Sequence, residues 1–161
     1  MAAGSDPRWL HLDRVHGVIQ AAMGWQNSHL HMFRIADREY GPAYLDDELE
    51  TLNEKQFRVG DLVKTGDLAS YEYDFGDGWE HELAVGASAT ADAAAVYPEC
   101  TEGEGACPPE DCGGPGGFTD LKELLAGPPS PEREEMRAWA GEEYDPAYFD
   151  LAAANAAAGS V

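Results

Sequence analysis

The stretch YEYDFGDGWEHELAV, Tyr71–Val85, decides the fold, because two alternating runs flank a glycine-rich turn. In each run every second residue is aromatic or apolar, and the residues between them are mostly acidic. A period of two is typical of a β-strand with one buried face. The stretch therefore predicts an antiparallel β-hairpin.

The length of the turn sets which residues face each other. A two-residue turn would place aromatic side chains opposite acidic ones. A three-residue loop pairs Phe75 with Trp79 and Tyr73 with His81, so the apolar side chains share one face. We therefore predict the three-residue loop, with Gly78 in the left-handed conformation that such loops require.

Helical periodicity and capping residues predict the elements around the hairpin. We expect a helix over 10–24, a strand over 29–35 that is covered on both faces, a surface loop over 86–95, and helices over 118–127, 130–141 and 145–159. Thr119, Ser130 and Asp145 are the expected N-caps. The order predicts one α+β domain over 1–161: an antiparallel sheet with a central hairpin, packed by an N-terminal helix and C-terminal helices. Residues 152–161 are expected to form a frayed tail.

The chain is strongly acidic, with 31 Asp and Glu against 10 Lys and Arg and a formal net charge of −21. Proteins bind DNA largely by neutralising phosphates with Lys and Arg, so we expect no nucleic-acid partner. No apolar run reaches the roughly 18 residues of a membrane span, and the N-terminus lacks a signal-peptide layout. We expect a cytoplasmic protein whose acidity serves either solubility or the binding of an unknown protein partner.

The stretch CTEGEGACPPEDCGG, Cys100–Gly114, carries all three cysteines; we call it the Cys loop. Cys100, Cys107 and Cys112 would form a zinc site if a fourth ligand, such as His81, joined them. The alternative is a rigid connector, packed against the hairpin, with three reduced thiols. Acidic neighbours disfavour a nucleophilic cysteine, because they raise the pKa of a thiol.

Histidines and carboxylates form a second candidate site. Strand alternation places His29 and His31 on one face, where both imidazoles could bind a metal. The alternative is that both histidines pack beneath helices. The candidate functional cluster comprises His29, His31, Asp74, Asp77, Trp79, His81, Glu110 and Asp111. We expect several of its members to converge, with Asp77 and His81 approaching the Cys loop.

Four segments together resemble one family, the plasmid pRiA4b ORF-3-like proteins. They are VIQAAMGWQNSHLHMFRI, YEYDFGDGWEHELAV, CPPEDCGGPGGF and MRAWAGEEYDPAYFDLAAAN, and the resemblance extends from Leu10 to Asn155. It implies an α+β fold with an antiparallel sheet. Some members carry a resolvase label, but the acidity and the scattered arginines of this chain argue against that activity.

The resemblance implies a binding or accessory module associated with mobile elements; the alternative is a metal-dependent enzyme with a His/Cys/carboxylate site that holds zinc. Family members begin with a further strand, which this sequence is expected to lack. The strand 29–35 or the hairpin would then form an exposed sheet edge, through which the chain could self-associate.

Overall fold

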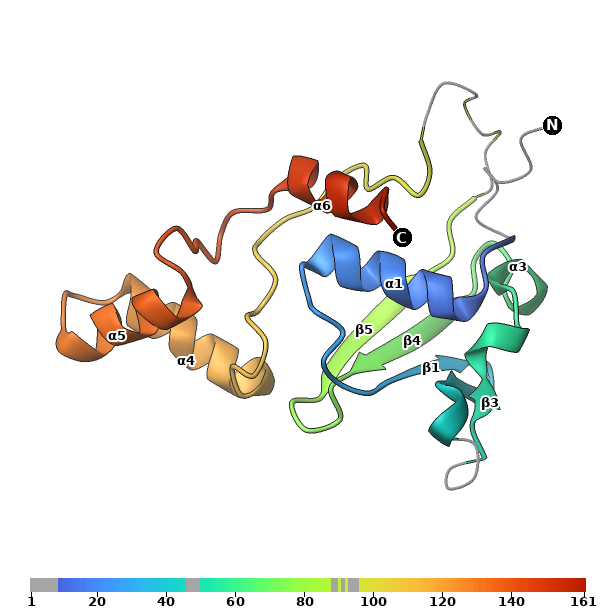
Figure 1. The fold of residues 1–161 in the computed structure, drawn as a ribbon, viewed down its shortest axis with the longest axis horizontal. Coiled ribbons are helices and arrows are strands. Elements are labelled where there is room, and N and C mark those ends of the chain that lie inside the picture. Colours follow the sequence, from blue (N-terminus) through green and yellow to red (C-terminus); the bar gives the residue numbers. More distant parts are fainter. Residues whose placement is uncertain (1–8, 46–49, 88–89, 91, 93–95) are drawn as a thin grey trace.

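The computed structural model describes residues 9–45, 50–87, 90, 92 and 96–161, and it is built around a five-stranded sheet (Figure 1). The strands are β1 (His31–Ile35), β2 (Arg38–Gly41), β3 (Leu52–Asn53), β4 (Leu68–Tyr73) and β5 (Trp79–Ala84), in the order β3-β2-β1-β4-β5. All pairs are antiparallel except β2 with β3, which is parallel. The predicted α+β class is confirmed, although the sheet is mixed.

Strands β4 and β5 form the predicted hairpin, but the predicted register is wrong by two residues. Tyr73 pairs with Trp79 and Tyr71 with His81, so Phe75 belongs to the turn and is 38% exposed. Because the shift is an even number of residues, the predicted division between an aromatic face and an acidic face still holds.

Asp74 is the reason for the longer turn. Its backbone is left-handed, with φ of 57°, and its Oδ1 accepts hydrogen bonds from the N–H groups of Gly76 (3.0 Å) and Asp77 (3.3 Å). This Asx-type turn ends β4 at Tyr73. Gly78 has a φ of 69°, which confirms the predicted left-handed glycine.

Helix α1 (Leu12–Met23) covers one face of the sheet (Figure 1) and ends at Gly24, as predicted. Leu12 of this helix packs with Phe33, Tyr71 and Tyr73 in the main core. Tyr40 on β2 adds a further aromatic side chain to this core. The 29–35 strand is therefore buried against α1, and the opposite face of β1 is also covered at Met32, which is 2% exposed.

The last helix, α6 (Leu151–Ala158), packs on α1, with Ala154 and Ala158 buried. We expected a frayed tail over 152–161, but small side chains allow this helix to lie close to α1. The helix does not begin at Asp145 as predicted. Asp150 is the N-cap and accepts a hydrogen bond from Ala153 N–H at 2.9 Å.

Helices α4 (Gly114–Ala126) and α5 (Pro131–Ala140) form an arm that extends from the body (Figure 1). Ser130 caps α5 as predicted. Thr119 does not cap α4, because the helix begins five residues earlier. Gly113 precedes the first turn with φ of 89°, and Thr119 Oγ1 donates to Pro115 O at 2.8 Å within the helix.

Short helices connect the strands: η2 (Ala43–Leu45), η3 (Glu54–Gln56) and α3 (Val59–Leu62). The strand 29–35 and the hairpin were the two candidates for an exposed sheet edge. β1 lies inside the sheet, whereas β5 of the hairpin lies at an edge. The predicted surface loop over 86–95 falls largely outside the described residues. No helix within the described ranges is long and apolar enough to cross a bilayer.

Candidate metal centre

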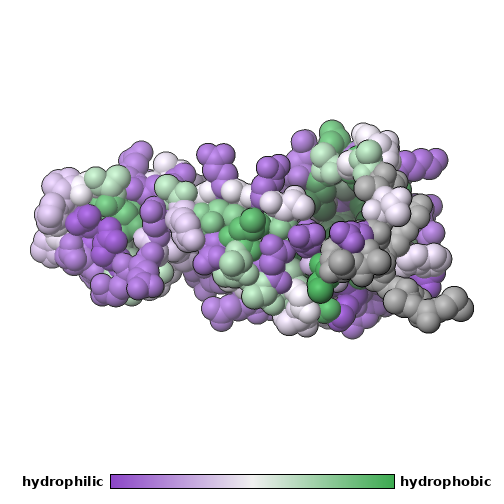
Figure 2. Space-filling view, turned by 90° about the horizontal axis from the view of Figure 1, so that it is seen from above, coloured by the Kyte–Doolittle hydropathy of each residue, from purple (hydrophilic) through white to green (hydrophobic). Residues whose placement is uncertain are grey.

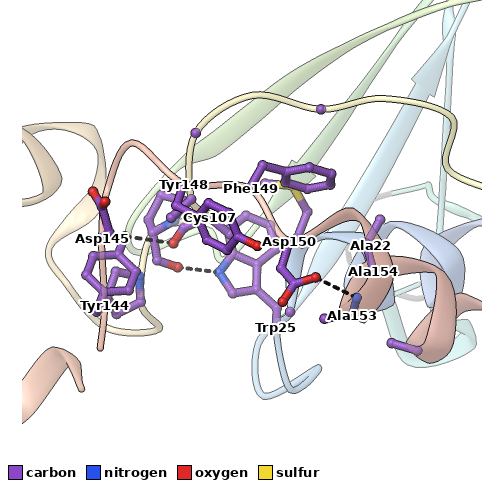
Figure 3. Close-up of a pocket in the computed structure, with 18 of the residues that line it drawn as sticks. Ala22, Trp25, Cys107, Tyr144, Asp145, Tyr148, Phe149, Asp150, Ala153 and Ala154 are labelled. Atoms are coloured by element: carbon purple, nitrogen blue, oxygen red, sulfur yellow. Dashed lines mark hydrogen bonds between the residues drawn. The ribbon is translucent and has the colours of Figure 1, made fainter. Parts of the chain in front are cut away.

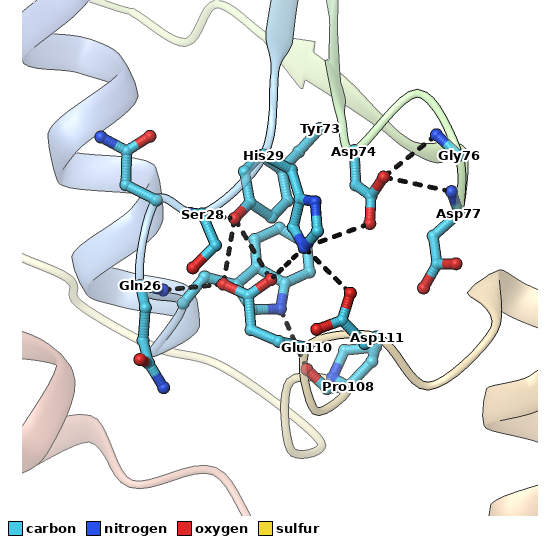
Figure 4. A network of polar contacts seen from close by, with 12 residues as sticks. Gln26, Ser28, His29, Tyr73, Asp74, Gly76, Asp77, Pro108, Glu110 and Asp111 are labelled. Atoms are coloured by element: carbon cyan, nitrogen blue, oxygen red, sulfur yellow. Dashed lines mark hydrogen bonds and ion pairs between the residues drawn. The ribbon is translucent and has the colours of Figure 1, made fainter.

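Three carboxylates converge on one imidazole nitrogen, His29 Nε2 (Figure 4). The nearest oxygens are Asp111 Oδ1 at 3.1 Å, Glu110 Oε2 at 3.5 Å and Asp74 Oδ2 at 3.6 Å. Nε2 is buried and has no hydrogen-bond partner among the described residues. We call these four residues the His29 centre. A buried polar atom without a hydrogen-bond partner is uncommon in native structures, and such atoms often have a functional role.

Asp74 reaches the centre because of the hairpin turn. Its Oδ1 is held by the N–H groups of the turn, so Oδ2 is left to face His29. The residue is 8% exposed. The same hydrogen bonds that end β4 therefore fix one carboxylate oxygen in place.

Glu110 is positioned by groups from two other segments. Its Oε1 accepts from Gln26 N–H at 2.8 Å, and Tyr73 OH lies 3.0 Å from Oε1 and 3.2 Å from Oε2. Ser28 N–H donates to the same Tyr73 oxygen at 3.0 Å. Burial, and then the hydrogen bond to Glu110, raises the pKa of Tyr73 to about 12. At neutral pH the phenol is therefore protonated and donates to the carboxylate.

Asp111 forms the open side of the centre. Its side chain is 73% exposed, whereas that of His29 is 27% exposed. Its backbone is left-handed, with φ of 58°, which turns the side chain back toward His29. An ion or a small ligand would therefore enter past Asp111.

The spacing of these atoms fits a metal ion. One atom from each of His29, Asp74 and Asp111 lies within 4.8 Å of the others, and the described residues contain no other such group. In a tetrahedral site with bonds of about 2.0–2.1 Å, neighbouring ligand atoms lie about 3.3 Å apart. The distances from Nε2 to Asp111 Oδ1 (3.1 Å) and to Asp74 Oδ2 (3.6 Å) are close to that edge length.

The charge of the centre also favours a cation. Three carboxylates surround a single imidazole, and no Lys or Arg in the described ranges forms an ion pair with any of them. Neighbouring carboxylates repel one another unless a proton or a metal ion compensates them. Hydrogen bonds that orient the ligands, here from Tyr73 and the hairpin turn, are typical of metal sites.

The Cys loop is anchored beside this centre, as predicted for a connector packed on the hairpin. Trp25 Nε1 donates to Pro108 O at 3.0 Å, and Gly113 N–H donates to Asp77 Oδ2 at 3.2 Å. Gly114 packs directly on the Asp77 carbonyl, where no larger residue would fit. Asp77 thus fastens the loop and does not point into the centre.

The other predicted members of the cluster lie elsewhere. His31 is buried in the core, stacked on His16 at 3.5 Å and hydrogen-bonded to Glu54 at 2.8 Å. His29 precedes β1, so strand alternation does not hold the two imidazoles together. His81 bonds the Tyr71 carbonyl and packs edge-on against Trp25. Trp79 packs against Trp25 and Phe118.

The predicted cysteine site is not assembled. Cys100, Cys107, Cys112 and His81 are all described, and they do not form a group with metal-ligand spacing. Burial and the charge of Glu110 raise the pKa of Cys107 to about 12, and burial and Asp77 raise that of Cys112. Metals bind thiolates, so a metal at either thiol would have to displace its proton.

Sequence reasoning missed the residues that support the centre. Tyr73 reads as a core aromatic, and the hydrogen bonds from Gln26 and Ser28 involve backbone N–H groups that leave no sequence signal. It also missed Glu54, whose pairing with His31 depends on an η3 turn far along the chain.

Comparison with known proteins places the chain in a family. It is 39% identical to the uncharacterized protein y4hQ of Sinorhizobium fredii (strain NBRC 101917 / NGR234) over 153 residues, which is 92% of this chain and 75% of that protein. The crystal structure of a protein of unknown function, MM3350 from Methanosarcina mazei Go1, superposes with a TM-score of 0.81 at 31% identity, over 91% of this chain and 83% of that one. The model of the plasmid pRiA4b ORF-3-like proteins matches residues 7–153. The chain belongs to the plasmid pRiA4b ORF-3-like family.

Proposed function

We propose that this protein binds a divalent first-row metal ion at the His29 centre and acts as a metal-containing binding or accessory module. The single observation that carries the proposal is the buried, unpartnered His29 Nε2 with three carboxylate oxygens at metal-ligand spacing. One imidazole and several carboxylates suit zinc or manganese better than the softer copper(I). Zinc is the first expectation, because zinc sites with an open position use three protein ligands, and His29, Asp74 and Asp111 supply three here.

A metal-dependent enzyme is the second candidate, and the exposure of Asp111 favours it. A catalytic ion needs an open coordination position for water or substrate, and the centre is open on the Asp111 side. The association with mobile elements rests on the family name alone. We retain it as part of the proposal for the module.

Metal binding is tested on the full chain, purified without chelator and analysed for metal content before and after treatment with EDTA. The stripped protein is then titrated with zinc and with manganese by calorimetry. We expect about one ion per chain, because the described residues contain one group with metal-ligand spacing. The variant Asp111→Asn should weaken binding at least tenfold, and Tyr73→Phe, which removes the hydroxyl that contacts Glu110 and Ser28 N–H, by about tenfold.

Asp120→Asn, an exposed acid on α4 outside the centre, is the matched control and should leave the affinity unchanged. Failure of the wild-type protein to bind either ion would overturn the proposal. The four residues would then form a polar cluster that holds no metal ion. Equal affinity of the Asp111 variant and the wild type would place the ion elsewhere.

A further inference from the structure

A second feature, distinct from the His29 centre, is a groove between the Cys loop, the end of α1 and the segment 139–157 (Figure 3). Its volume is about 1080 Å³. Seen from above, hydrophilic residues cover much of the surface, and apolar residues gather between the arm and the body (Figure 2). The groove therefore lies between the arm formed by α4 and α5 and the body of the molecule, which Figure 1 shows side by side.

Aromatic rings form much of the groove wall. Trp139 is 49% exposed and Tyr148 63% exposed, so both rings are open to a ligand in the groove. Trp25 and Tyr144 are held in place, because Trp25 donates to Pro108 O and Tyr144 OH donates to Cys107 O at 2.9 Å (Figure 3). The wall thus combines two fixed rings with two solvent-facing ones. Aromatic faces attract cations as well as apolar groups.

The charge of the groove has one sign. Six acidic residues line it: Glu102, Glu104, Glu110, Glu143, Asp145 and Asp150. Among the described residues the lining contains no Lys, Arg or His. Apart from Glu110, which lies beside His29, none of the six forms an ion pair with a described basic residue.

We propose that this groove binds a polypeptide segment that carries lysine or arginine side chains. The acidic residues would pair with the cationic ends, and the exposed rings of Trp139 and Tyr148 would cover the aliphatic stems. The volume exceeds the roughly 300–1,000 Å³ that encloses a drug-sized molecule, so it suits several residues of a peptide better than one small amine.

The net charge supports the same partner. At −21 the chain attracts basic segments over long range and repels a second copy of itself. The proposal does not depend on metal binding, since Glu110 is the single residue that the groove shares with the His29 centre.

In the test, the full chain in EDTA buffer is titrated with a peptide of alternating lysine and leucine, whose N-terminus is acetylated and whose C-terminus is amidated. Binding is measured by the tryptophan fluorescence of the protein. The groove variant is Glu102→Gln/Glu104→Gln/Glu143→Gln. Its control, Glu123→Gln/Glu132→Gln/Glu135→Gln, removes the same number of exposed acids from α4 and α5 outside the groove. Loss of three surface ion pairs should weaken binding by about tenfold, whereas the control should change it less than about twofold.

A third variant tests the aromatic wall without altering charge. Trp139→Ala should weaken the peptide about two- to fivefold. Equal losses in the groove and control variants would overturn the proposal, because they indicate diffuse attraction to an acidic surface. The proposal would also be overturned if a peptide with glutamate in place of lysine bound equally well. The same holds if free lysine amide bound as tightly as the peptide. Circular dichroism of each variant confirms that it remains folded.

Discussion

His16 makes the stability of this protein depend on pH in a way that can be calculated from its surroundings. The side chain is 5% exposed. Its Nδ1 lies 2.7 Å from Tyr71 OH, its Nε2 lies 2.8 Å from Asn27 Oδ1, and its ring stacks on His31 at 3.5 Å. Burial, and then the nearby His31, lowers the pKa of His16 from 6.5 to about 4, although the hydrogen bond that Nε2–H donates to Asn27 Oδ1 partly opposes the shift.

The direction follows from which state takes up the proton. The unfolded chain binds a proton at His16 near its ordinary pKa of 6.5, whereas the folded chain resists protonation until about pH 4. The contribution to stability is therefore complete above pH 6.5 and is lost as the pH falls toward 4. Between pH 7 and pH 5 the free energy of unfolding should decrease by about 2 kcal/mol, and at most by about 3 kcal/mol at lower pH. This is a large share of a typical domain stability of about 5–15 kcal/mol.

The assay is urea unfolding at several pH values from 7 to 5, in EDTA so that metal release does not contribute. His16→Gln should lose most of this pH dependence, because glutamine keeps a polar contact with Tyr71 but does not titrate. The control is His11→Gln at the start of the same helix; His11 bonds the Lys55 carbonyl and is only partly buried. It should keep the wild-type pH dependence.

Subtraction of the His16→Gln curve from the wild-type curve isolates the contribution of His16 together with its coupling to His31, Glu54 and Asp13. Identical slopes for the wild type and His16→Gln would refute the reasoning. If His11→Gln instead lost the slope of unfolding free energy against pH, the pH dependence would come from His11 and not from His16.

Three further predictions concern the Cys loop. Trp25→Phe should lower the free energy of unfolding by about 1 kcal/mol in urea titrations, because it removes the hydrogen bond to Pro108 O. Gly114→Ala should be more destabilising, by about 2 kcal/mol or more in the same assay, because the residue has φ of 68° and its added methyl group would collide with the Asp77 carbonyl. A wild-type melting temperature in this variant would contradict the packing described. Cys107 should react with iodoacetamide at pH 8 far more slowly than an unfolded cysteine, because its pKa is raised to about 12; peptide mapping of the alkylated protein measures this.

Local chemistry was sufficient to predict much of the fold. Periodicity located α1, β1 and the hairpin, and capping residues located α5, because the signals for these elements lie within a few residues of one another. The three-residue loop was wrong because Asp74 uses its own side chain to end the strand early. Thr119 and Asp145 resemble N-caps, but α4 already begins at Gly114, and Asp145 accepts from Ala147 N–H in a separate turn, while Asp150 caps α6.

At the candidate site, too, residue types follow from the sequence, whereas their arrangement follows from the tertiary structure. The sequence by itself determined that His29, Asp74, Glu110 and Asp111 carry metal-binding chemistry, since residue type alone decides which atoms can ligate. Their convergence required the docking of the Cys loop on the hairpin, through Trp25 and Asp77. Packing of His31 on His16 and Glu54 in the core separates it from His29. Contacts between segments more than thirty residues apart depend on packing of the whole domain, so no local pattern in the sequence encodes them.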